Sequence, residues 1–175
     1  MKALFLHISD TIAAKAPAIR WTDFDLGQLD GGQNAPVSYP CALVSFGEAN
    51  YNRFGAGLRM AVQPFRLRLA FTVRERTHSK NDTAFRDEAL AHLDVVEAVK
   101  NALTKTTGSA IFGGIELTGQ SNEQRADHRI YQLSFSCKVW EDPNNPMTGD
   151  PTYKPVEDWP GATLPVKPCI HPFIA

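Results

Sequence analysis

Strict alternation of apolar and polar residues marks the middle of the chain. Between Pro64 and Arg76, apolar side chains occupy every second position, and arginine, threonine or other residues fall between them. Alternation of this length predicts a β-strand with one face buried and the other in water. The alternating apolar residues are Phe65, Leu67, Leu69, Phe71 and Val73.

The residues just before this run alternate in the opposite phase. Leu58, Met60 and Val62 occupy even positions, whereas the apolar residues after Pro64 occupy odd ones. A slip of one residue would turn every following side chain to the other face of a sheet. We therefore predict a β-bulge at Gln63–Pro64, where a strand also tolerates proline, and a single long, bent strand.

Further strands are predicted on both sides of this one. A second long alternating strand covers His128–Trp140, with Tyr131, Leu133, Phe135, Cys137 and Val139 inward. A continuous apolar run suits a central strand buried on both faces. The other predicted segments are that central strand at Tyr39–Phe46, a glycine-bearing hairpin loop at Gly47–Gly57, a short edge strand at Ile19–Trp21, a strand weakened by Gly113–Gly114 at Ala110–Thr118, and a polar hairpin loop at Gly119–Asp127.

Two segments have the period of an amphipathic helix. Residues 3–16 carry Leu4, Ile8, Ile12 and Ala16 at four-residue spacing, and Pro17 should end that helix. The second helix covers Thr83–Lys105, with Asp82 or Thr83 as N-cap. Its apolar stripe is Phe85, Ala89, Leu93, Val96, Val99 and Leu103. His92 lies beside this stripe, and we interpret it as a partly buried or solvated histidine, not a catalytic one.

These elements predict an α+β fold. We expect a mainly antiparallel, twisted sheet with the N-terminal helix and one long amphipathic helix packed on it. The expected core under the long helix is Phe65, Leu67, Leu69, Phe71, Leu93, Val96, Leu133 and Phe135.

The composition changes after residue 140. Residues 141–175 contain eight of the twelve prolines, which favour extended geometry and exclude a regular helix. The segment also holds apolar residues that a plain disordered tail would lack, among them Tyr153, Trp159, Leu164, Ile170 and Phe173. We therefore divide the chain into a domain at 1–140 and an extended C-terminal arm at 141–175. The arm is expected to dock on a neighbouring subunit, with docking on its own domain as the alternative.

Charge and motifs give few signs of chemistry. The net charge of −1 provides no global field for nucleic acid. The odd cysteine count, with Cys41 and Cys137 in apolar runs, predicts reduced core thiols in a cytoplasmic protein. No segment reaches the length of a membrane span, and we expect a mature N-terminus without a signal peptide. Asp23, Asp25 and Asp30 do not have calcium-loop spacing and are interpreted as part of a solvated loop. No catalytic residue, metal or cofactor is predicted.

One surface has a functional appearance, the outward face of the central strand. It carries Arg66, Arg68, Arg74 and Arg76. This arginine face is either solvated, a subunit contact or a contact to nucleic-acid backbone, and the lack of aromatic residues in the stripe disfavours single-strand binding. The candidate subunit or partner contacts are Arg66, Arg68, Arg74, Tyr51, Arg53, Phe54 and Trp159.

The order of these segments resembles a known family over residues 4–140. The residues that carry the resemblance are Pro17-Ala18-Ile19, a loop with Gln28, Tyr39-Pro40-Cys41-Ala42-Leu43-Val44 followed by Phe46, Leu93-Asp94 on the lone long helix, and Leu133-Ser134-Phe135. The pattern is similar to that of the tail terminator (tail completion, minor tail) proteins of long-tailed phages and prophages.

The resemblance implies a non-enzymatic structural protein of the virion tail, assembled in the cytoplasm of a bacterial host. Family members form rings, usually hexameric, that cap the tail tube and contact the head–neck connector. The family has no catalytic residues or cofactors. The alternative is a small α+β domain that binds a ligand or nucleic acid through the arginine face, and an enzyme without a recognisable motif is a third hypothesis.

Overall fold

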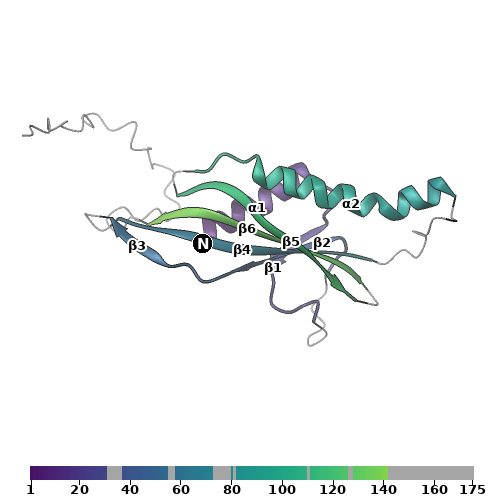
Figure 1. Cartoon of the computed structure of the whole chain (residues 1–175), viewed down its shortest axis with the longest axis horizontal. Helices are drawn as coiled ribbons and strands as arrows, with labels where there is room; N and C mark the ends of the chain where they lie inside the picture. The colour runs from purple at the N-terminus through teal and green to yellow at the C-terminus, as the bar shows by residue number, and fades with distance from the viewer. Residues whose placement is uncertain are drawn as a thin grey trace, which may run out of the picture.

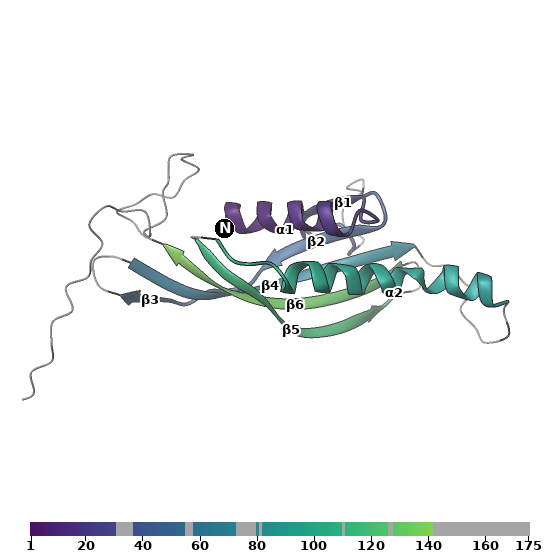
Figure 2. The same cartoon turned by 90° about the horizontal axis from the view of Figure 1, so that it is seen from above.

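The computed structural model places two helices on one face of a six-stranded sheet (Figures 1 and 2). It describes residues 1–30, 37–54, 58–72, 80, 82–109, 111–125 and 128–141. The elements are α1 (Lys2–Lys15), β1 (Trp21–Phe24), β2 (Cys41–Phe46), β3 (Tyr51–Phe54), β4 (Leu58–Thr72), α2 (Thr83–Thr104), β5 (Phe112–Gln124) and β6 (His128–Glu141). The predicted α+β fold is confirmed, and the rest of the predicted arm, residues 142–175, lies outside the described residues.

The sheet has the strand order β1-β2-β4-β6-β5, and β3 pairs with the first residues of β4, Leu58 to Ala61. β1 is parallel to β2, and the other pairs are antiparallel. The predicted hairpin of β2 and β4 is present, but its connection contains the strand β3, which the sequence did not predict. The edge strand expected at Ile19–Trp21 begins at Trp21 instead.

Both helices bury the stripe that their period predicts, with two exceptions. Leu4, Ile8 and Ile12 of α1 are buried, and α1 ends before Pro17. In α2, Asp82 is the N-cap, and its side chain accepts a hydrogen bond from the backbone N–H of Ala84. The buried residues of the α2 stripe are Ala89, Val96, Val99 and Leu103.

The exceptions are Phe85 and Leu93, whose side chains are 48% and 44% exposed. The assignment of Leu93 to the core was wrong, and so was the expectation that the apolar stripe would bury Phe85. At 3.6 residues per turn, Leu93 lies on the flank of the stripe and not at its centre. Phe85 is on the inward side, but the first turns of α2 extend past the ends of the strands (Figure 1). No sheet lies beneath that part of the helix.

β4 contains no bulge, so that prediction was also wrong. Its register with β6 is continuous from Arg59–Glu141 to Thr72–His128. Ala61 and Gln63 are therefore in phase with Phe65 and face the helices, where both are buried. Leu58, Met60 and Val62 face the opposite side of the sheet.

Pro64 is accommodated in β4 by the side chain next to it. Proline lacks the N–H that a strand residue would donate to its neighbour. On that side of β4, the backbone N–H of Gly47 donates to the Pro64 carbonyl at 2.9 Å. The buried Gln63 side chain supplies the missing donor, because its Nε2 lies 2.8 Å from the carbonyl oxygens of both Gly47 and Pro64.

β5 is longer and more irregular than predicted. The polar stretch from Gly119 to Gln124 was expected to be loop, but it belongs to the strand. The register with β6 shifts between Phe112 and Ile115 and again between Leu117 and Gly119. Gly113 lies at the first shift, where a Cβ would stand only 3.2 Å from Cη2 of Trp140.

Apolar residues are buried on both faces of the sheet. The larger core lies between the helices and the sheet, and includes Phe65, Leu67, Leu69, Leu133 and Phe135 as predicted. On the other face, a smaller cluster consists of Leu29, Cys41, Leu43, Ala70 and Ile130. Cys41 and Cys137 are free and buried, as predicted. Burial raises the pKa of each thiol to about 11.

Candidate functional site

The arginine face lies on the side of the sheet that carries no helix. Arg66 and Arg68 both point to this side, but their surroundings differ. Arg66 is exposed, next to Gln132 on β6, whereas Arg68 is only 7% exposed. The expectation of a solvated face is therefore wrong for Arg68.

Three carboxylates surround the guanidinium of Arg68. Glu123 on β5 accepts two hydrogen bonds, from Nε and Nη2, each 2.8 Å long. Asp25 accepts from Nη1 at 3.1 Å, and Asp30 accepts from Nη2 at 3.0 Å. Arg125 also contacts Asp30. We call these five residues the Arg68 cluster.

The loop after β1 brings two of these carboxylates onto the sheet. Gly27 has a φ of 83°, which glycine adopts without strain, and its N–H donates to Oδ1 of Asp25 at 3.1 Å. Leu29 is buried against the smaller apolar cluster. This part of the chain was expected to be a solvated loop, but it covers the second face of the sheet.

The electrostatics fix the charge state of the cluster. Burial alone would lower the pKa of Arg68, but its hydrogen bonds to Asp30, Glu123 and Asp25 outweigh burial and raise it. The hydrogen bond from Arg68 lowers the pKa of Asp30. Arg68 is thus permanently charged and already paired, and the cluster is suited to fastening the loop, not to binding a phosphate or a nucleic acid.

Three of the remaining candidate contacts, Tyr51, Arg53 and Phe54, lie on β3, at the end of the sheet where β3 pairs with the start of β4. The Tyr51 hydroxyl donates to Oε1 of Glu141 at 3.1 Å. Arg53 is exposed and stands directly opposite Arg59, which is also exposed. Phe54 ends β3, but its side chain is outside the described part of the molecule. Arg74 and Trp159 also lie outside the described residues.

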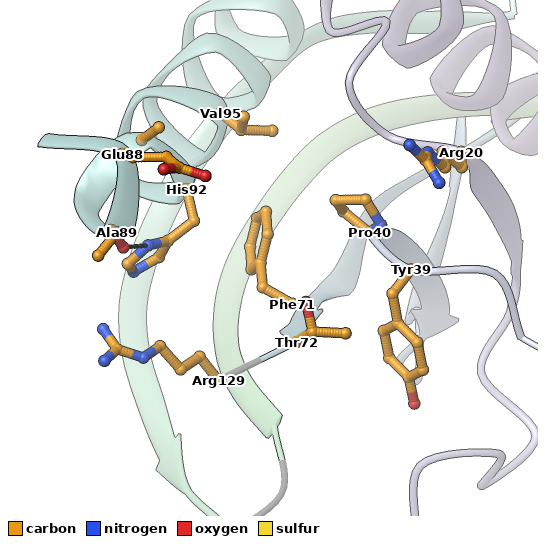
Figure 3. Close-up of a pocket in the computed structure, with 11 residues that line it drawn as sticks. Arg20, Tyr39, Pro40, Phe71, Thr72, Glu88, Ala89, His92, Val95 and Arg129 are labelled. Atoms are coloured by element: carbon orange, nitrogen blue, oxygen red, sulfur yellow. Dashed lines mark hydrogen bonds between the residues drawn. The ribbon is translucent and has the colours of Figure 1, made fainter. Parts of the chain in front are cut away.

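A pocket of about 530 Å³ lies at the other end of the molecule, between α2 and the Tyr39–Pro40 segment (Figure 3). Phe71, Thr72 and Arg129 line it from the strands, and His92 and Glu88 line it from α2. Figure 3 shows His92 turned to its own helix, where its Nδ1 donates to the Ala89 carbonyl oxygen at 2.9 Å.

The same hydrogen bond determines what His92 can do. Because Nδ1 carries the proton, Nε2 accepts from the Tyr131 hydroxyl at 2.9 Å. Burial lowers the pKa of His92, which favours the neutral ring. Both ring nitrogens are therefore occupied by contacts within the fold, and the prediction that His92 is partly buried is confirmed.

No group of three or more His, Cys, Asp or Glu side chains in the described ranges is arranged to hold a metal ion. None of the helices in the described part of the chain is long and apolar enough to cross a membrane.

Proteins similar to this chain are found among solved structures. No protein-family model matches the chain, and a search of curated proteins gives no match. Among solved structures, the chain is similar to a chain of "Virion of native gene transfer agent (GTA) particle". The two are 18% identical, with a TM-score of 0.44, and the similarity covers 79% of this chain and 95% of that chain.

The Arg68 cluster was missed by sequence reasoning. Its acidic partners were visible only as polar residues in two separate segments, one interpreted as a solvated loop and the other as a hairpin loop. One signal in the sequence could have drawn attention to them. Arg68 is a charged residue in the most apolar part of the strand, between Leu67 and Leu69 and just before Ala70 and Phe71.

Proposed function

We propose that this chain is a non-enzymatic structural protein of a phage or prophage tail, and that it forms a homo-oligomeric ring of the tail-terminator kind. Such a ring, hexameric in most members of the family, would cap the tail tube and contact the head–neck connector proteins. It would be assembled in the cytoplasm of the bacterial host. The pattern of residues 4–140 supports the family, and the α+β fold agrees with it.

The observation that carries the proposal is the like-charged pair at the β3–β4 end. Arg53 and Arg59 are directly opposite each other and exposed, and neither forms an ion pair among the described residues. Glu141 lies opposite Arg59 on β6, but its carboxylate accepts from the Tyr51 hydroxyl instead. Like charges at directly opposed positions destabilise a strand pair. A partner surface with negative charge would relieve this repulsion.

The half of α2 that lies toward the opposite end of the molecule carries such a surface. Asp87 and Asp94 are exposed on α2, and their spacing of seven residues puts them on the same side of the helix. β3 and the first turns of α2 lie at the two ends of the long axis (Figure 1). A head-to-tail contact between unlike ends generates a ring when the rotation closes.

Charge reversal provides the test. Replacing Arg53 and Arg59 with glutamate should leave the monomer folded and lower self-association in sedimentation at low salt. Replacing Asp87 and Asp94 with arginine should do the same. A matched control reverses two exposed basic residues on neither surface, Lys2 and Arg20, and should assemble like the unmodified protein.

The decisive measurement mixes the two reversed variants. Each new charge then meets its complement, so that alternating rings of an even number of subunits should form, visible by negative-stain electron microscopy. Failure of the mixture to assemble, or unchanged assembly of each variant alone, would contradict the head-to-tail contact.

The structure gives no comparable support to the ligand- or nucleic-acid-binding alternative. Arg68, at the centre of the arginine face, is buried and paired with three carboxylates. Of the two arginines of that face that the structure describes, only Arg66 is exposed to a partner.

A further inference from the structure

An apolar strip lies on the face of the sheet away from the helices. It consists of Leu58, Met60, Val62 and Pro64 along β4, with Trp140 of β6 paired beside Met60. Leu58 is 38% exposed and Val62 is 54% exposed. Several apolar side chains in one exposed row are typical of a surface that is covered by something else.

The strip leads into a hollow of about 280 Å³. Small residues from neighbouring strands line the hollow and leave room for it, namely Ser45, Gly47, Thr118 and Ser134. Pro64 and Arg66 also line it. A hollow beside an apolar row can receive one large aromatic anchor, which is the usual arrangement at the centre of a docking surface.

Charge at the edge of the strip matches the C-terminal segment. Arg66 and Lys138 are exposed on this face of the sheet, and together they outweigh the one exposed carboxylate among the described residues beside the strip, Glu116 of β5. Residues 142–175 contain four acidic residues and two lysines, and Glu157 and Asp158 directly precede Trp159. Two carboxylates followed by a large aromatic side chain suit an apolar hollow with a basic edge.

The length of chain between the sheet and Trp159 also fits. β6 ends at Glu141, opposite Arg59. Arg66 is seven positions further along β4, or roughly 23 Å at the usual rise of a strand. The seventeen residues from 142 to 158 can cover this distance, because a flexible chain of that length spans about 23 Å and an extended, proline-rich one up to about 53 Å. The tether is therefore long enough to bring Trp159 to the hollow of its own chain.

We propose that the segment after Glu141 docks on the apolar strip of its own chain, with Trp159 in the hollow and Glu157 and Asp158 near Arg66 and Lys138. The sequence analysis favoured docking on a neighbouring subunit, with the arm's own domain as the alternative. The tether length favours its own domain, because the strip begins beside the residue from which the arm leaves. This contact does not depend on ring assembly.

Disulfide trapping in the full-length protein tests the proposal. Thr118→Cys places a thiol at the hollow, Gly161→Cys places one close to Trp159, and Cys169→Ser removes the natural cysteine of the arm. The control pairs Gly161→Cys with Asp94→Cys, an exposed position on α2 and on the other side of the sheet. Circular dichroism verifies that both proteins are folded, and Cys41 and Cys137 are buried in each.

Under mild oxidation, the Thr118/Gly161 pair should form a disulfide within one chain, at several times the yield of the control and independent of protein concentration. Adding Trp159→Ala or Val62→Glu should lower that yield several-fold. Equal yields in the two pairs, disulfides only between chains, or a yield unaffected by both added substitutions would overturn the proposal. Disulfides only between chains would indicate that the arm docks on a neighbour.

Discussion

For Arg68, the alternating pattern predicts the face of the sheet but not whether the side chain is buried there. The pattern correctly placed it on the face opposite Leu67 and Leu69, but did not indicate that a loop would cover that face. Removing the guanidinium would leave the carboxylates of Asp25, Asp30 and Glu123 facing one another. The cost of such a change comes mainly from the uncompensated charges that remain.

We expect Arg68→Met to lower the free energy of unfolding by about 2–3 kcal/mol, less than for a fully buried ion pair, because Asp30 and Glu123 remain partly hydrated. The exposed Arg66 is the matched control, and Arg66→Met should change stability by less than about 0.5 kcal/mol. Urea denaturation measures both values. Similar losses at the two positions would mean that the cluster does not hold the loop.

His92 should make stability depend on pH. Burial lowers its pKa in the folded state below the ordinary value of 6.5, so the unfolded chain binds a proton more readily. The contribution of His92 to stability is therefore fully present above pH 6.5 and is lost as the pH falls below that value.

The measurement is the free energy of unfolding at a series of pH values from 7.5 to about 5, in the range where an ordinary histidine titrates. The difference between the unmodified protein and His92→Gln isolates this residue from other titrating groups. The unmodified protein should lose more stability on acidification than the variant. Parallel curves would show that the ring is not protected from protonation in the fold.

At the scale of the elements, β4 depends on a side-chain hydrogen bond that the spacing of its apolar residues does not predict. Pro64 interrupts the donors along one edge of the strand, and the Gln63 side chain replaces the missing N–H. This explains why a buried glutamine occupies an otherwise apolar face and why the strand continues without a bulge.

Gln63→Leu should cost about 1–3 kcal/mol, because it leaves the carbonyl oxygen of Gly47 without a donor, whereas the Pro64 carbonyl still accepts from the Gly47 N–H. Pro64→Val restores a backbone N–H directed toward Gly47. In the Gln63→Leu background it should therefore recover part of the lost stability. If the double variant is no more stable than Gln63→Leu alone, the glutamine is not acting as a substitute donor.

The whole molecule is elongated, with α2 extending past the strands at one end and β3 at the other (Figure 2). The sheet and both helices are complete by Glu141. The division into a domain at 1–140 and an arm remains a proposal, and it predicts how a shortened chain should behave.

A chain ending at Glu141 should keep its far-ultraviolet circular dichroism and unfold cooperatively, because the two apolar clusters lie within it. It should also bind more of an apolar dye than the full-length protein, since the strip would be uncovered. Val62→Lys in the shortened chain should reduce that binding. Loss of a cooperative transition would show that residues 142–175 belong to the core of the domain.

The sequence by itself determined the class of fold and most of the elements. α1, α2, β4 and β6 follow from periodicity, because the spacing of apolar residues in a local window depends on the geometry of a single helix or strand. β2 follows from a continuous apolar run. The same local signal indicated which residues of β6 face the helices. It was less reliable for β5, a polar edge strand whose pairing comes from β6.

Only the tertiary structure decided which faces are covered and which charges are paired. The contacts of Arg68 join residues 38, 43 and 55 positions apart, and no local window includes such distances. The exposure of Phe85 depends on where the sheet ends beneath α2, and the exposure of Val62 depends on which face the helices occupy. These properties arise from the arrangement of complete elements, so they became visible only when the chain was folded.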